Sequence, residues 1–169
     1  SGVYGTPVEI AESTAPVRIL RRELIADSGG AGRCRGGLGQ RIELESSEGA
    51  PIQLFAGVER TKYPARGREG GTEGALGRIS LQSGPRLAGK GEQTIPAGDT
   101  LIWETPGGGG YGSPLDRDPA AVALDVKQGL VSVASARSAY GVVLDKAGRV
   151  DANATLEQRA ALRPSPATD

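Results

Sequence analysis

The sequence predicts a mainly β protein of the α+β class: an antiparallel sandwich or barrel-like domain with a small helical appendage at its C-terminal end. Short stretches with apolar residues at alternate positions recur up to residue 104, separated by frequent glycine and proline. No alternation of strands with helices is visible before residue 118, which argues against a parallel sheet. After Tyr111 the character changes, and helix-capping residues precede apolar positions one turn apart.

Five strands are expected before residue 105. The clearest covers residues 52–58, where every second side chain is apolar, as in a strand with one buried face. Ile42 and Leu44 repeat this period in the second strand, and Trp103 alternates with Leu101 in the last. We expect Trp103 to pack in the core, and this interpretation is favoured over a role as a surface on which a ligand stacks. The predicted strands are residues 17–25, 41–45, 52–58, 79–82 and 100–104.

Three helices are expected after Tyr111. Asp118 is a typical N-cap and Pro119 fits the first turn, so a helix over 120–128 is predicted, with Gly129 ending it. In the rest of the chain, Ser132 caps a helix to about residue 139, residues 140–144 form a strand, residues 145–148 form a turn, and Asp151 caps a helix over 152–162. These elements suggest a glycine-rich β domain (1–114), a helical appendage (115–163) and a disordered tail (164–169).

The composition excludes several classes of function. The 169 residues hold 20 basic and 20 acidic side chains, so no basic field is available for nucleic acid or an anionic membrane. No apolar run approaches the length of a membrane span and no N-terminal signal pattern is present, so a cytoplasmic location is expected. Histidine is absent and Cys34 is the single cysteine, which leaves no catalytic triad or common zinc ligands. We assign no catalytic and no metal-binding residue.

Two glycine-dense runs, residues 27–39 and 104–112, are the most informative feature of the chain. Glycine costs backbone entropy on folding, so such clusters persist where the chain needs positive φ or where another backbone or a partner approaches closely. The second run contains a G-x-G-x-x-G pattern, but the predicted helix begins only at Asp118. A dinucleotide site, in which the glycines open a helix, is therefore not expected.

The first run offers two interpretations. Asp27 is suited to an Asx turn, and Arg33 and Arg35 beside a glycine bend are able to hold a carboxylate or phosphate in a nest of N–H groups. The favoured alternative is a tightly packed turn whose arginines meet glutamates of a neighbouring strand. Residues 60–77 are too rich in glycine and charge for regular structure, and they form either a functional or a solvated long loop.

Five colinear segments of this sequence resemble one protein family. They are TPVEI (6–10), DSGGAGRCRGGLG (27–39), ETPGGGGYGSP (104–114), RDPAAVALDVKQGLVSVASARSAYGVVLD (117–145) and GRVD (148–151). Together they are similar to the C-terminal part of the hydantoinase B/oxoprolinase family, which includes the B component of N-methylhydantoinase and the corresponding half of 5-oxoprolinase. The chain departs from the usual family pattern at Cys34, where tyrosine is more common, and at Ser113, where aspartate is more common.

The resemblance implies a part of a multi-component, ATP-dependent hydrolase that opens a cyclic amide of the hydantoin or 5-oxoproline class. It implies partners as well: a hydantoinase A-type subunit that binds ATP, and the N-terminal portion of the B component, where metal-binding histidines would lie. This chain would then hold neither cofactor and would be inactive alone, as a C-terminal domain or split small subunit. Two alternatives stay open, a related ATP-dependent ketone carboxylase and a purely structural assembly subunit.

The resemblance makes the glycine runs candidates for lining the site or an interface. Their backbone N–H groups are expected to face the catalytic part and bind an oxyanion or a phosphorylated intermediate. The candidate residues are Asp27, Gly29, Gly30, Arg33, Arg35, Gly36, Gly37, Gly107, Gly108, Gly109, Gly110 and Tyr111.

Overall fold

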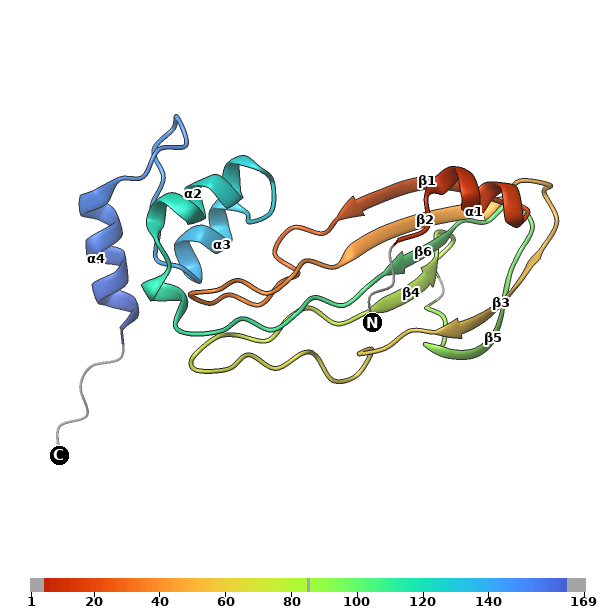
Figure 1. Ribbon diagram of the computed structural model, residues 1–169, viewed down its shortest axis with the longest axis horizontal. Helices are drawn as coiled ribbons and strands as arrows, with labels where there is room; N and C mark the ends of the chain where they lie inside the picture. The colour runs from red at the N-terminus through yellow and green to blue at the C-terminus, as the bar shows by residue number, and fades with distance from the viewer. Residues whose placement is uncertain (1–4, 85, 164–169) are drawn as a thin grey trace. The chain divides into compact units, whose positions relative to one another are not determined.

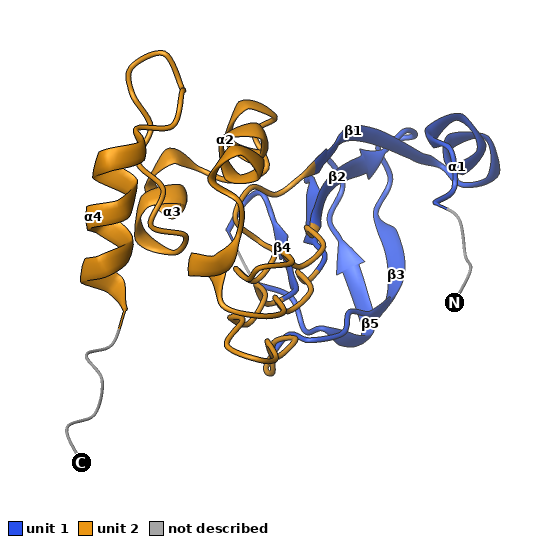
Figure 2. Ribbon diagram, turned by 60° about the vertical axis from the view of Figure 1, so that its left-hand side comes forward, with its two compact units in different colours: residues 1–23, 40–61, 77–105 blue, residues 24–39, 62–76, 106–169 orange. Residues whose placement is uncertain are grey.

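The computed structural model describes residues 5–84 and 86–163, which divide into two compact units (Figure 2). Unit 1 comprises residues 1–23, 40–61 and 77–105, and unit 2 comprises residues 24–39, 62–76 and 106–169. Each unit is thus assembled from three separated stretches of chain. The domain boundary at residue 114 stays a prediction, and the expected tail at 164–169 lies outside the described residues.

Unit 1 is built on two antiparallel sheets (Figure 1). The four-stranded sheet has the order β1-β2-β6-β4, formed by β1 (Val17–Leu24), β2 (Gln40–Ser46), β6 (Leu101–Glu104) and β4 (Arg78–Leu81). The two-stranded sheet pairs β3 (Ile52–Gly57) with β5 (Lys90–Ile95). All five predicted strands are present, with ends that differ by one or two residues.

The two sheets of unit 1 share one hydrophobic core, as expected for a sandwich. Trp103 on β6 pairs with Ile42 on β2 and with Ile79 on β4, and its side chain packs against this core, which confirms its predicted role. No closed barrel forms among the described residues, so the sandwich is the correct alternative. The buried core residues are Ala56, Val58, Ile79, Leu81, Ile95 and Leu101.

Two elements of unit 1 were not expected from the sequence. Helix α1 (Val8–Thr14) buries none of its residues, so it shows no apolar face by which to recognise it. Strand β5 carries a single buried apolar residue, Ile95, and its sequence KGEQTI lacks the alternation on which strand prediction depends.

Unit 2 contains the three helices that follow residue 113. A 3-10 turn (Pro114–Asp116) precedes α2 (Pro119–Lys127), α3 (Val133–Ser138) and α4 (Ala152–Leu162). The three predicted N-caps are confirmed, because the side chains of Asp118, Ser132 and Asp151 accept hydrogen bonds from the amides of Ala120, Ser135 and Ala154 at 2.9, 3.0 and 3.0 Å.

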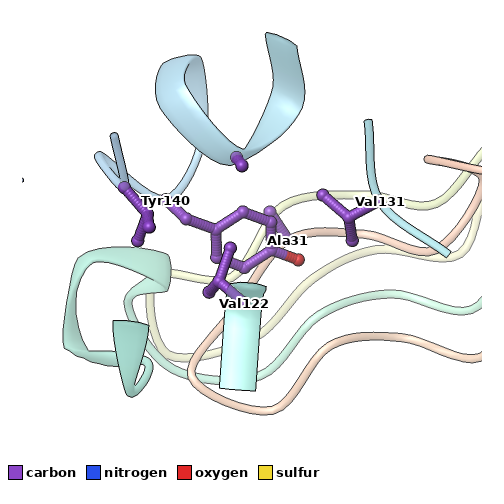
Figure 3. Packing of buried hydrophobic residues seen from close by; sticks show 6 residues of the cluster. Ala31, Val122, Val131 and Tyr140 are labelled. Atoms are coloured by element: carbon purple, nitrogen blue, oxygen red, sulfur yellow. The ribbon is translucent and has the colours of Figure 1, made fainter. Parts of the chain in front are cut away.

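The expected strand at residues 140–144 is not formed. This stretch is irregular, and only Leu144 makes an isolated bridge, with Val150. Its apolar pattern reflects the core of unit 2 instead: Tyr140 is 1% exposed and Val142 is equally buried. Figure 3 shows the Tyr140 ring directed among other members of this core, Ala31, Val122 and Val131.

The turn predicted at residues 145–148 is present. The Asp145 carboxylate accepts hydrogen bonds from the amides of Ala147 and Arg149, and Gly148 takes a φ of 76°. Across the described residues, no helix is both long and apolar enough to span a membrane.

Candidate functional site

The predicted site residues lie in a part of unit 2 that we call the glycine bundle. It consists of five legs without helix or strand, residues 28–32, 33–37, 65–68, 71–75 and 107–112, which run beside one another as the long irregular segments of Figure 1. Residues 107–112 form the central leg. Its amides at Gly107, Gly108 and Gly110 donate to the carbonyls of Ala75, Gly37 and Thr72 at 2.9–3.0 Å. Backbone hydrogen bonds thus join legs that are far apart in sequence.

Close backbone packing explains why glycine is needed in this bundle. A Cβ atom at Gly110 would overlap the carbonyl oxygen of Ala31, and one at Gly36 would overlap that of Gly108. The same holds at Gly29, Gly30, Gly107 and Gly109, which face the carbonyls of Gly36, Thr72, Ser28 and Arg66 respectively. The predicted close approach of another backbone is therefore confirmed, and that backbone belongs to the same chain.

The amides of the central leg have partners inside the bundle. Besides the three bonds above, the amide of Tyr111 donates to the carbonyl of Cys34 at 2.9 Å. The amide of Cys34 donates to the carbonyl of Tyr111, also at 2.9 Å. These four amides are therefore not free to bind an oxyanion. The bundle acts at these positions as a hydrogen-bonded support.

Asp27 connects the bundle to the helices of unit 2. Its carboxylate accepts a hydrogen bond from the amide of Ser132 at 2.9 Å, and its own amide donates to the carbonyl of Leu130 at 3.1 Å. Asp27 has a φ of 60°, an unusual value outside glycine that aspartate tolerates better than most residues. The expected local Asx turn is replaced by this long-range contact.

Arg33 and Arg35 have different environments. Arg35 donates through Nε to the Asp125 carboxylate at 3.3 Å, and Arg117 donates to the same oxygen at 2.8 Å. The side chains of both arginines are 17% exposed and that of Asp125 is 10% exposed, so the three charges form a largely buried cluster. The favoured interpretation was right that an arginine meets a carboxylate, but the partner lies on α2 and not on a strand.

Sequence reasoning missed both Asp125 and Arg117. A signal for Asp125 was available, because it lies three residues after Val122 and therefore on the apolar face of α2. A carboxylate on the buried face of a helix has to be paired with a cation, because an unpaired buried charge is costly.

The cluster continues into α4 through backbone carbonyls. Arg117 donates to the carbonyl of Arg33 at 3.1 Å, and its own carbonyl accepts from Arg159 at 2.6 Å. Arg159 also donates to the carbonyl of Tyr140 at 3.2 Å. Desolvation lowers the pKa of the Arg159 guanidinium and raises the pKa of the Tyr140 phenol, so Tyr140 is neutral at neutral pH.

Arg33, Cys34 and Tyr111 lie on the surface of the bundle. Tyr111 is 47% exposed, and Cys34 and Arg33 are exposed as well. Tyr111 bridges to Cys34 on one side and to Arg68 on the other. Most of the candidate glycines therefore pack against other backbone segments and hold the bundle together, Gly37 is open, and a few side chains face outward.

Two shallow hollows of about 330 and 390 Å³ both lie on unit 1, one beside the end of α1 and the other over the outer side of β3 around Phe55. Among the described residues, no three histidine, cysteine or acidic side chains are grouped to hold a metal ion. The exposed side chains of Arg33, Cys34 and Tyr111 suit a contact surface.

Comparison with known proteins identifies the family. The model of the Hydantoinase B/oxoprolinase family matches residues 1–114. The chain belongs to the hydantoinase B/oxoprolinase family. The match extends over both glycine runs.

Relatives of this hydantoinase B-type chain are larger proteins. The β subunit of caprolactamase from Pseudomonas jessenii is 40% identical over 91% of the chain, which corresponds to 28% of that subunit. The crystal structure of the ATP-dependent caprolactamase from the same organism superposes with a TM-score of 0.72 at 36% identity, again over 91% of this chain and 28% of the other. Nucleotide-free acetone carboxylase gives a TM-score of 0.70 at 25% identity, over 93% of this chain and 26% of the other. The chain thus spans little more than a quarter of these proteins.

Proposed function

We propose that this chain is the C-terminal domain or a split small subunit of a hydantoinase B component in an ATP-dependent enzyme that opens a cyclic amide. The similarity to caprolactamase over 91% of the chain, with a TM-score of 0.72, carries this proposal. The chain spans 28% of that protein, so the proposal assigns the rest of the catalytic unit to parts outside these 169 residues. The substrates we propose are lactam-type rings such as hydantoin, 5-oxoproline and caprolactam.

We propose two partners, a hydantoinase A-type subunit that binds ATP and the N-terminal portion of the B component, which binds a divalent metal. The described residues of this chain do not fit either group, since they offer no set of metal ligands and the central-leg amides are engaged in the bundle. No step of the reaction is therefore assigned to residues of this chain. We also propose that the complex is cytoplasmic, because its proposed use of ATP suits that compartment.

The twelve candidate residues contribute in this proposal by forming an interface. The closely packed glycines set the spacing of the legs, and Asp27 and Arg35 connect the bundle to the helices through Ser132 and Asp125. Arg33 and Tyr111 then present their side chains to the remainder of the enzyme from a rigid base.

The test is reconstitution of the complex from this chain, the A-type subunit and the N-terminal portion of the B component. We expect ATP hydrolysis that depends on a cyclic amide, and its loss when this chain is omitted. ATP hydrolysis without a cyclic amide is the control. Equal turnover with and without the chain would refute the proposal.

Ketone carboxylation is a second candidate function, because acetone carboxylase matches 93% of the chain with a TM-score of 0.70. The same reconstituted complex separates the two reactions when it is supplied with acetone and bicarbonate. ATP turnover with the ketone, and none with hydantoin, 5-oxoproline or caprolactam, would assign the carboxylase.

The packing of the bundle favours a third possibility, a purely structural role in assembly. In that case Gly110→Val, which places a side chain against the Ala31 carbonyl, prevents association of the components. The complexes that do form then turn over at the normal rate. A reduced rate in fully assembled complexes would instead show that the bundle supports catalysis.

A further inference from the structure

Two arginines and a tyrosine form an exposed patch at one end of the glycine bundle, which we call the arginine patch (Arg33, Arg68 and Tyr111). The backbone of Gly112 holds both arginines in place: its carbonyl accepts from the amide of Arg33 at 3.1 Å, and its amide donates to the carbonyl of Arg68 at 3.0 Å. Tyr111 lies next to Gly112 and bridges to Arg68. Backbone contacts thus place these three residues, from three different legs, beside one another.

Both guanidinium groups of the patch lack a carboxylate partner within the described part of the chain. Arg33 and Arg68 are exposed and form none of the ion pairs in that part of the chain. Arg35 and Arg117, in contrast, both form ion pairs with Asp125. Glu69 follows Arg68 in sequence, but it too is exposed and forms no ion pair among the described residues. The Arg33 side chain lies over Gly112, since a Cβ there would meet its Nε at 3.3 Å.

We propose that the arginine patch docks an acidic segment of a partner protein. Guanidinium groups bind carboxylates in a forked, two-bond geometry, and arginine and tyrosine are enriched among the residues that dominate interface energies. All three side chains of the patch are exposed and come from three separate legs, which suits an extended partner better than a small anion. Zero net charge argues against nucleic acid.

This inference deepens the proposed function and rests on it in one respect: the partner would be another component of the same complex. The acidic segment then serves as a positioning contact that orients the glycine bundle relative to that component. Charge attraction at such an exposed contact raises the association rate and weakens with salt.

The first experiment measures binding of a twelve-residue oligoglutamate peptide to the full chain. We expect Arg33→Glu combined with Arg68→Glu to weaken binding by about tenfold or more. The matched control is Arg137→Glu combined with Lys146→Glu, which changes the charge of unit 2 equally at two exposed side chains outside the patch. It should change binding by less than about twofold.

A milder pair of variants guards against loss of folding. Arg33→Gln combined with Arg68→Gln removes both charges but keeps polar side chains, and it should weaken binding by an intermediate factor. Tyr111→Ala should weaken it as well, whereas Tyr63→Ala should not, although Tyr63 is the more exposed ring at 80%. Equal effects of the patch and control variants, or binding of inorganic phosphate in preference to the peptide, would overturn the proposal.

The second experiment repeats these variants in the complex with the A-type subunit and the N-terminal portion of the B component. Assembly should become about tenfold weaker in the patch variant and remain sensitive to salt in the control. If the components never assemble but the peptide still binds at the patch, the proposed function fails and the docking surface stands. If the complex assembles and the patch variant behaves like wild type, the docking surface fails and the proposed function stands.

Discussion

At Gly110 the carbonyl oxygen of Ala31 occupies the place where a side chain would begin, and neither backbone is free to move because both legs are hydrogen-bonded to others. Gly110→Ala should therefore lower the free energy of unfolding by about 1–3 kcal/mol, the usual cost of overpacking. Urea unfolding followed by circular dichroism measures the change.

Gly37→Ala is the matched control, because the Cβ position at Gly37 is open and its φ lies outside the left-handed region. It should change the free energy of unfolding by less than about 0.5 kcal/mol. Equal losses in the two variants would mean that flexibility, and not close backbone packing, explains the glycines.

Asp125 is the residue on which two buried cations depend. Asp125→Asn removes the charge that faces Arg35 and Arg117, and it should cost about 3 kcal/mol of unfolding free energy because both guanidinium groups stay largely buried. The comparison is Glu59→Gln, which breaks an exposed pair with Lys90 and should cost less than about 1 kcal/mol. Chemical denaturation of both variants decides whether the cluster stabilises unit 2.

The sequence shows at the residue scale that the glycines need close packing, but not what packs there. The Cβ clash at Gly107 comes from Ser28, nearly eighty positions away, and no local pattern records that distance. Asp27 is a similar case, since its amide and carboxylate reach Leu130 and Ser132. In the sequence, the only sign of such a long-range backbone contact is the glycine, and its partner is not indicated.

At the scale of the elements, strand β2 carries a charge pair that makes stability depend on pH. A hydrogen bond from Arg41 to Glu43 at 2.7 Å is the main cause that lowers the Glu43 pKa, and Arg21 contributes less. Because the pKa of Glu43 is lower in the folded state, its carboxylate stabilises the fold fully at any pH above the ordinary glutamate pKa. This stabilisation is lost as the pH falls through the lowered pKa.

We therefore expect the difference in unfolding free energy between wild type and Glu43→Gln to be constant from about pH 6 to 8 and to shrink below about pH 4.5. Glu48→Gln, at an exposed position without an ion pair among the described residues, should follow the wild-type profile. A constant difference down to pH 3 would contradict the assignment. Urea unfolding across this pH range provides the measurement.

Elements with strong local signals were predicted well. The caps at Asp118, Ser132 and Asp151 place the three helices of unit 2 correctly, because capping is a local interaction. Residues 140–144 were assigned wrongly to a strand because a core segment and a strand share the same apolar spacing. α1 and β5 were missed because neither displays an apolar pattern.

At the scale of the whole molecule, each unit has a hydrophobic core of its own. Leu101 is buried in the core of unit 1 and Tyr140 in that of unit 2, so Leu101→Ala and Tyr140→Ala should each cost about 2–5 kcal/mol. Native-state hydrogen exchange measures where each variant acts. Leu101→Ala should speed up amide exchange in β4 and β6, and Tyr140→Ala should speed it up in the glycine bundle and α2. Uniform acceleration of exchange throughout the chain by either variant would indicate a single cooperative core.

Family membership and fold class followed from the sequence, while the division into units did not. The colinear glycine runs indicated the hydantoinase B/oxoprolinase family, which the family model and the caprolactamase similarity confirm. The predicted domains follow the chain in order, whereas the compact units combine stretches on both sides of residue 105. Contacts between such distant stretches depend on the whole fold, and local patterns do not contain them.

The central leg of the bundle has a consequence for synthesis of the protein on the ribosome. Residues 28–37 and 65–75 emerge well before residues 107–112, and the hydrogen bonds that join them to this leg have no partner until it appears. Loops of this length close slowly, and segments that wait unpaired are exposed to wrong association. The nascent chain should therefore acquire the protease resistance of unit 2 only after residues 107–112 have emerged, in a step limited by long-range closure.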